Sequence, residues 1–152
     1  MNDAYTIVLA LHNIVRWFVV LIGLAAAGLA LYGWFGKKSW TNLDNQLGLY
    51  YTIAVDTQVL LGLLLYFLLS PITKAAFSDF GASMADADLR FWSVEHITVM
   101  ILVLVLAHVG RSRSKKAATD AGKHKNAAIF FTIAAIITLL GIPWFRPLLP
   151  AF

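Results

Sequence analysis

The sequence predicts an all-α integral membrane protein, built as an antiparallel up-and-down bundle of four transmembrane helices. Two observations indicate this fold class. Of the 152 residues, 60% are hydrophobic and 13% are charged, whereas soluble domains are about 45–50% apolar and about 25% charged. Four apolar runs, at about 5–35, 47–70, 90–109 and 127–145, are long enough to cross a hydrocarbon core of about 30 Å. The chain has no cysteine, which excludes disulfides and thiolate metal sites.

Helix-ending and charged residues separate the four runs. The first run ends at Gly36-Lys37-Lys38, and Ser70-Pro71 closes the second. Residues 72–89 are small and polar, with a composition typical of a short surface helix. The basic segment Arg111–Lys125 follows the third run, and Gly141-Ile142-Pro143 ends or bends the fourth. These short connections predict that residues 1–152 form a single four-span membrane domain.

Lysine and arginine are distributed unevenly over the connections. Eight of the twelve lie after the first and third runs: Lys37, Lys38, Arg111, Arg113, Lys115, Lys116, Lys123 and Lys125. The positive-inside rule places these two connections in the cytoplasm and both termini outside. The basic charge is therefore interpreted as a topology signal in contact with membrane lipids, with no role in binding nucleic acid. A docking surface for a soluble partner is the alternative.

Polar side chains inside a span are costly, so each one is a functional-site candidate. They are His12 and Arg16 in the first run, Asp56 and Gln58 in the second, and Glu95, His96 and His108 in the third. For any single histidine the alternative is a hydrogen-bonded packing residue, and for Arg16 it is snorkelling to lipid headgroups. His124 lies in the basic connection and is expected to be solvated.

A b-type haem needs two axial ligands from different helices, usually imidazoles. His96 is the best-placed ligand, and His12 is the second. Arg16 lies one turn after His12 on the same helix face, where it is suited to a haem propionate, a quinone oxygen or Glu95.

The expected depths of these histidines differ. If Trp17 and Trp92 lie at the same outer interface, His12 is about 13 Å further out than His96. A helix tilt of about 20° closes only part of this offset. His108 is expected about 18 Å deeper than His96 and about 120° around the helix, so it would serve a separate inner site.

The carboxylates leave several alternatives open. Asp56 and Gln58 point in nearly opposite directions, so at most one of them faces His96. Asp56 is expected either to be protonated and hydrogen-bonded across the bundle or to bind an ion. Glu95 is expected to orient an imidazole on another helix, to relay a proton, or to be a solvated carboxylate at the interface. No serine has a recognisable base partner, so no catalytic residue is assigned.

Several stretches of the chain resemble small four-span bacterial membrane proteins labelled cytochrome b-like, of the type found in Bacteroidota. They are LHNIVRW at Leu11–Trp17, QVLLGL at Gln58–Leu63, LRFWSVEH at Leu89–His96, RSRSKK at Arg111–Lys116 and GIPW at Gly141–Trp144. All four spans contribute to the resemblance. It implies haem b, electron transfer and a bacterial cytoplasmic membrane, with His12 and His96 as the principal positions. Such relatives often carry a histidine near Thr57, so the chain departs from the pattern there.

Three functional hypotheses follow. The first is a b-type cytochrome-like electron-transfer protein with a possible link to a quinone. The second is a cofactor-free accessory subunit that packs against a larger complex through small-residue faces such as Gly23–Ala27 and Ala26–Ala30. The third is a small proton- or ion-coupled carrier built around Asp56 and Glu95. A short chain with minimal connections is expected to be a homo-oligomer or a subunit, and an electron carrier rather than a stand-alone enzyme.

Overall fold

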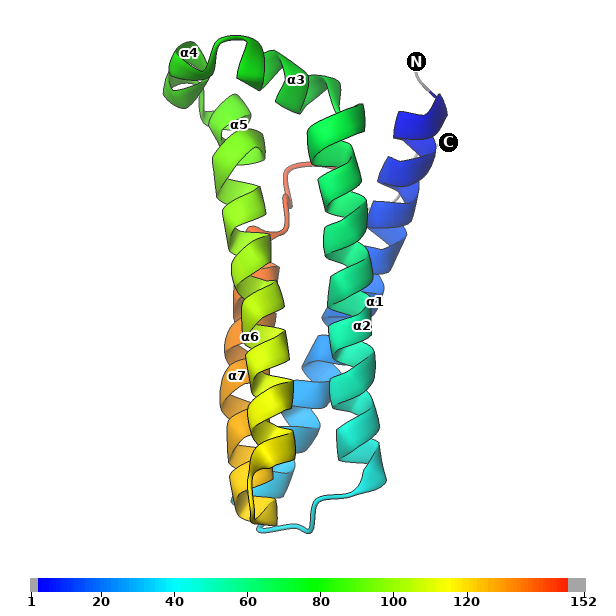
Figure 1. Ribbon diagram of the computed structural model, residues 1–152, viewed down its shortest axis with the longest axis vertical. Coiled ribbons are helices and arrows are strands. Elements are labelled where there is room, and N and C mark those ends of the chain that lie inside the picture. The colour runs from blue at the N-terminus through cyan, green and yellow to red at the C-terminus, as the bar shows by residue number, and fades with distance from the viewer. Residues whose placement is uncertain (1–2, 148–152) are drawn as a thin grey trace.

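A computed structural model describes residues 3–147 and contains four long antiparallel helices (Figure 1). These are α1 (Asp3–Phe35), α2 (Asn42–Leu64), α6 (His96–Lys116) and α7 (Asp120–Gly141). A π-helical turn, η1 (Leu65–Leu69), continues α2, and another, η2 (Phe91–Glu95), leads into α6. All four helical segments are long and apolar enough to cross a membrane. The predicted all-α, four-span fold is confirmed, and the protein is a multi-pass membrane protein.

The four helices pack as a closed ring in which α1 contacts α2 and α7, and α6 contacts the same two helices. Small residues allow the close approach of α1 and α7, because lipid supplies little hydrophobic force between helices and packing must replace it. The predicted small-residue positions Gly23, Ala26, Ala27 and Ala30 are all buried. Alanines of α7 belong to the same core: Ala127, Ala128 and Ala134.

The helix ends follow their sequence signals. Thr41 caps α2 through a capping box, in which its hydroxyl accepts from the Asp44 N–H and the Asp44 carboxylate accepts from the Thr41 N–H. The fourth helix ends at Gly141, four residues before the predicted limit. Pro143 disfavours a helical conformation at the residue before it, and Ile142 is extended (φ −70°, ψ 131°).

Three short helices close the end of the bundle where α1 begins (Figure 1). They are α3 (Pro71–Ser78), α4 (Phe80–Ala85) and α5 (Ala87–Arg90). Ser70, Asp79 and Asp86 cap them in turn. Tyr66 fixes this cover to the bundle, since its hydroxyl donates to the Ser93 carbonyl at 2.6 Å and its own carbonyl accepts from Thr73 Oγ1 at 2.8 Å.

The sequence predicts a solvated His124, and the structure shows that this prediction is wrong. The helix α7 begins at Asp120, seven residues before the predicted span, so His124 lies one turn inside it. Its side chain is 1% exposed and its ring lies 4.9 Å from that of Trp40. His124 Nε2 is 3.4 Å from the Ser39 carbonyl, and Nδ1 is 3.8 Å from Asp44 Oδ1. This histidine therefore joins the α1–α2 connection to α7.

Candidate functional site

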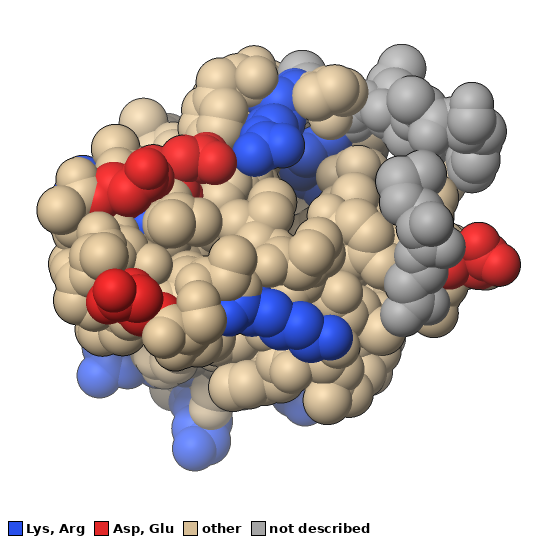
Figure 2. Space-filling model, turned by 90° about the horizontal axis from the view of Figure 1, so that it is seen from above, with Lys and Arg blue, Asp and Glu red and all other residues tan. Residues whose placement is uncertain are grey.

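A cavity of about 330 Å³ opens between the helices under the short-helix cover. Its walls come from α1, α2, η1, α3, η2, α6, α7 and the segment that follows α7. Figure 2 looks onto this end of the molecule and shows basic side chains beside a hollow, with acidic side chains at two opposite edges. The polar side chains that matter for chemistry are His12, Arg16, Gln58, Trp92, His96 and Arg146.

His96 has the geometry of an oriented imidazole. Its Nδ1 lies 3.0 Å from the carbonyl oxygen of Gly141, which α7 leaves without an intrahelical partner at its C-terminal end. A carbonyl accepts, so Nδ1 carries the proton and Nε2 keeps its lone pair. The neighbouring rings of Phe91 and Trp92 each lie 5.6 Å from the His96 ring and pack against it. His96 thus offers Nε2 as a ligand.

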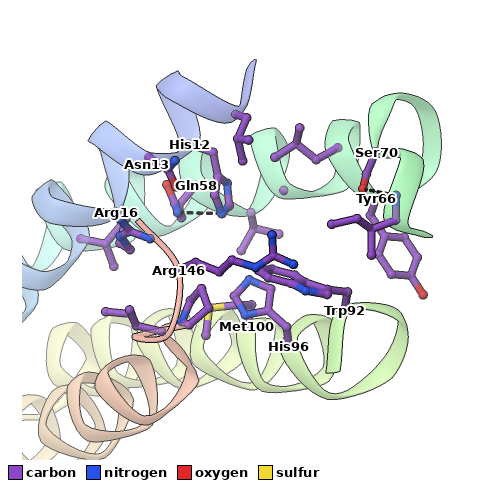
Figure 3. Close-up of a pocket in the computed structure, with 18 of the residues that line it drawn as sticks. His12, Asn13, Arg16, Gln58, Tyr66, Ser70, Trp92, His96, Met100 and Arg146 are labelled. Carbon is purple, nitrogen blue, oxygen red and sulfur yellow. Dashed lines mark hydrogen bonds between the residues drawn. The ribbon is translucent and has the colours of Figure 1, made fainter. Parts of the chain in front are cut away.

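His12 projects from α1 toward the same cavity, opposite His96 (Figure 3). Its Nε2 lies 3.1 Å from the amide nitrogen of Gln58 on α2. His12 Nδ1 and Gln58 Oε1 are buried and have no hydrogen-bond partner within the described residues. A buried polar atom without a partner is costly, so this side of the cavity has capacity for a bound group.

Gly62 makes room for the His12 ring. A Cβ at residue 62 would lie 3.2 Å from His12 Cε1, tighter than ordinary van der Waals contact. The glycine therefore lets α2 approach α1 closely at the level of the imidazole. Gly62 and Gln58 belong to the same QVLLG stretch and lie one helical turn apart on one face of α2.

Two arginines give the cavity a positive charge. Arg16 is 6% exposed and its guanidinium lies 5.7 Å from the centre of the Trp17 ring. Arg146 lies over the ring of Trp92 at 5.6 Å and reaches Asp88 at 3.4 Å. Among the described lining residues there is no aspartate or glutamate. The cavity is therefore suited to a ligand with anionic groups.

The depth offset expected between His12 and His96 is wrong. The two histidines line one cavity, although the aromatic residues Trp17 and Trp92 predicted a separation of about 13 Å. The reason is that Trp17 and Trp92 do not mark one level of the bundle. Trp92 lines the cavity, whereas Trp17 follows His12 by more than one turn toward the other end of α1.

The remaining candidates lie outside the cavity. Gln58 lines it and Asp56 does not, in agreement with their opposite directions on α2. His108 also lies outside and pairs with Asp56, with Nε2 2.7 Å from Oδ1. Glu95 is exposed and pairs with Arg90 at 2.8 Å, which corresponds to the solvated-carboxylate alternative.

Arg146 is the functional candidate that the sequence analysis missed, because it lies just beyond the fourth apolar run. The sequence signal for its position was Gly141-Ile142-Pro143, which ends α7. The residues that follow, including Arg146, line the cavity. In residues 3–147, no group of three His, Asp or Glu side chains is arranged to bind a metal ion by itself.

Comparisons with protein-family models, with curated proteins and with solved structures give no match to this chain. No family is therefore identified, and the chain is described by its fold, a four-helix protein with four candidate membrane spans.

Proposed function

We propose that the protein is a membrane b-type cytochrome-like electron carrier that holds one haem b in the outer cavity. One observation carries this proposal. Two imidazoles and two guanidinium groups line a single apolar cavity whose described walls contain no carboxylate. A haem has an iron that takes two axial imidazoles and two propionates that pair with arginine. The resemblance of the LHNIVRW and LRFWSVEH stretches to cytochrome b-like proteins supports the same cofactor.

His96 would be the principal ligand. The Gly141 carbonyl holds Nδ1–H, which fixes the tautomer, raises the basicity of the ring and directs Nε2 into the cavity. The contact crosses from α6 to the end of α7, so the position of the imidazole depends on the packing of these two helices.

His12 would be the second ligand, held by Gln58 as His96 is held by Gly141. The amide of Gln58 can rotate by 180°, which brings Oε1 to His12 Nε2 and makes Nε2–H the donor. In that orientation Nδ1 keeps its lone pair, and because Nδ1 is buried beside Gly62, the imidazole would have to turn to present this nitrogen to the cavity. Gln58 would therefore choose which nitrogen of His12 is the ligand.

Arg16 and Arg146 would hold the propionates. Arg16 approaches from α1, and Arg146 from the segment after α7, so the two cations bind from different elements. When bound, the haem supplies a one-electron couple at its iron. With His12 and His96 both as ligands, the group would transfer electrons, and we expect no bond chemistry.

A quinone is the second candidate for this cavity, favoured by the same donors. Arg16 and a histidine N–H can donate to quinone carbonyl oxygens, and the apolar walls suit a lipid-soluble ring. We also propose that the end carrying the α1–α2 and α6–α7 connections faces the cytoplasm of a bacterial inner membrane, since most of the lysines and arginines lie there.

The test is a reduced-minus-oxidised absorbance spectrum of the protein purified in detergent from cells supplied with haem. We expect a Soret band with split α and β bands in the wild type, and loss of these bands in His96→Ala. In His12→Ala we expect loss of the haem or the spectrum of a single-imidazole haem.

His108→Ala is the matched control, because it removes an imidazole from the same helix as His96 but outside the cavity. Its spectrum should equal that of the wild type. A flat wild-type spectrum would refute the cytochrome proposal. Quinone in an organic extract of that same preparation would then support the second candidate, and its absence would favour a cofactor-free subunit.

A further inference from the structure

The outward faces of the four spans differ in polarity. Between residues 7 and 31, every exposed residue of α1 is apolar, and the same holds for α7 between 127 and 140. The outward stripes of the other two helices contain polar members. On α2 and its continuation η1, the exposed residues from 53 to 68 are Ile53, Asp56, Thr57, Leu60, Leu64, Phe67 and Leu68. On α6 those from 98 to 108 are Thr98, Ile101, Leu102, Val105 and His108.

Asp56 and His108 form a pair on this outward surface. His108 Nε2 lies 2.7 Å from Asp56 Oδ1, and the two side chains are 51% and 50% exposed. Asp56 lies at the middle of the candidate span Asn42–Leu69. His108 lies roughly 12 Å before the end of its span at Lys116. The pair is therefore inside the membrane segments, where a polar group facing lipid is costly.

The same two helices are the least covered in the bundle. In the most apolar window of each candidate span, 17% of the α2 residues and 22% of the α6 residues are buried, against 39% for α1 and 44% for α7. Polar side chains and low coverage thus coincide on one face. The exposed residues of α1 and α7 are apolar and can contact lipid. The outward surface formed by the exposed residues of α2 and α6, called here the α2–α6 face, has the composition of a helix-packing surface.

We propose that a second copy of the chain packs against the α2–α6 face and encloses Asp56 and His108 between the two protomers. The face is self-complementary, because an acceptor carboxylate and a donor imidazole lie side by side on it. A two-fold axis that passes near the pair brings Asp56 of each protomer toward the partner's His108. Leu60 and Val105, one turn away on the two helices, surround the polar pair with apolar contacts. This inference does not depend on the haem.

Disulfide cross-linking tests the proposal, since the natural chain has no cysteine. Leu60→Cys and Val105→Cys place single thiols beside the pair. Leu21→Cys on α1 and Ile136→Cys on α7 are matched controls, with exposures of 63% and 52% at the native side chains. After oxidation in native membranes, we expect a band at twice 16.8 kDa on non-reducing gels for at least one of the α2–α6 variants. Neither control should give this band.

The role of the pair is tested by its removal. Asp56→Asn and His108→Ala should each raise the dissociation constant of the dimer in detergent about three- to tenfold, as measured by dilution with fluorescence-labelled protein. Leu21→Ala should leave it unchanged. A circular dichroism spectrum equal to that of the wild type verifies that each variant is folded.

Three results would overturn the proposal. The first is cross-linking with equal yield at Leu21→Cys or Ile136→Cys, which would move the interface elsewhere. The second is the absence of cross-links at both Leu60→Cys and Val105→Cys, which would leave the pair facing lipid. The third is a cross-linked band of another mass, which would show that the partner on this face is a different protein.

Discussion

Gly33→Ala tests how tightly the bundle is packed at the end where α1 and α2 are connected. Gly33 lies on α1 against the buried ring of His124, and a Cβ added there would come within 2.6 Å of three ring atoms. Real Cβ atoms do not make such contacts, so the imidazole must move. It has no free space to move into, because it is 1% exposed and packed on Trp40.

The expected cost has two parts. Overpacking a tight site costs about 1–3 kcal/mol. Displacing the ring from the Ser39 carbonyl leaves the buried His124 Nε2 without its partner, for about 1–3 kcal/mol more. Alanine is a better helix former than glycine, which offsets about 0.5–1 kcal/mol of this loss. The net loss of unfolding free energy is therefore about 1–5 kcal/mol.

Gly28→Ala is the matched control on the same helix. Nothing lies within 4 Å of a Cβ at residue 28, so only the gain in helix propensity remains. Thermal unfolding in detergent, followed by circular dichroism, measures both variants. A change of 1 kcal/mol shifts the midpoint by about 2–4 °C at this chain length. Gly33→Ala should melt several degrees below the wild type, and Gly28→Ala at or slightly above it.

The double variant Gly33→Ala/His124→Ala identifies the cause. If the ring is what the new methyl group meets, the two losses are not additive, and the double variant is more stable than their sum predicts. Equal melting temperatures for Gly33→Ala and Gly28→Ala would refute the close approach of α1 to His124.

Three further predictions concern other parts of the bundle. Thr41→Ala removes the capping box with Asp44 and should lower the unfolding free energy by about 0.5–2 kcal/mol in the same assay, while Thr41→Ser should retain most of it. Phe131→Ala leaves a cavity in the fully packed core and should cost about 3–5 kcal/mol, whereas a loss below about 1 kcal/mol would mean that the site collapses around the smaller side chain. Gly62→Val crowds the His12 ring and, on the proposed function, should shift or abolish the α band of the reduced spectrum without unfolding the helices; an unchanged spectrum would contradict His12 as a ligand.

The prediction of the four spans succeeded because membrane helices satisfy a local condition. A segment of about 20 apolar residues must form its own backbone hydrogen bonds in lipid, so composition alone locates it. Relations along one helix are equally local. The 3.6-residue period was enough to separate His96 from His108, and Gln58 from Asp56, and the structure places the members of each pair in different surroundings.

Relations between helices could not be obtained in this way. The axial position of α1 relative to α6 decides that His12 and His96 share a cavity. The helices between them position α1, through contacts such as Gly33 with His124 of α7 and His12 with Gly62 of α2. The tryptophans were a poor measure of depth, since an aromatic ring can line a cavity as Trp92 does. The sequence by itself therefore determined the spans and the face on which each polar residue lies. Only the tertiary structure decided which of these faces meet, because small-residue contacts allow helices to slide and rotate until close packing selects one arrangement.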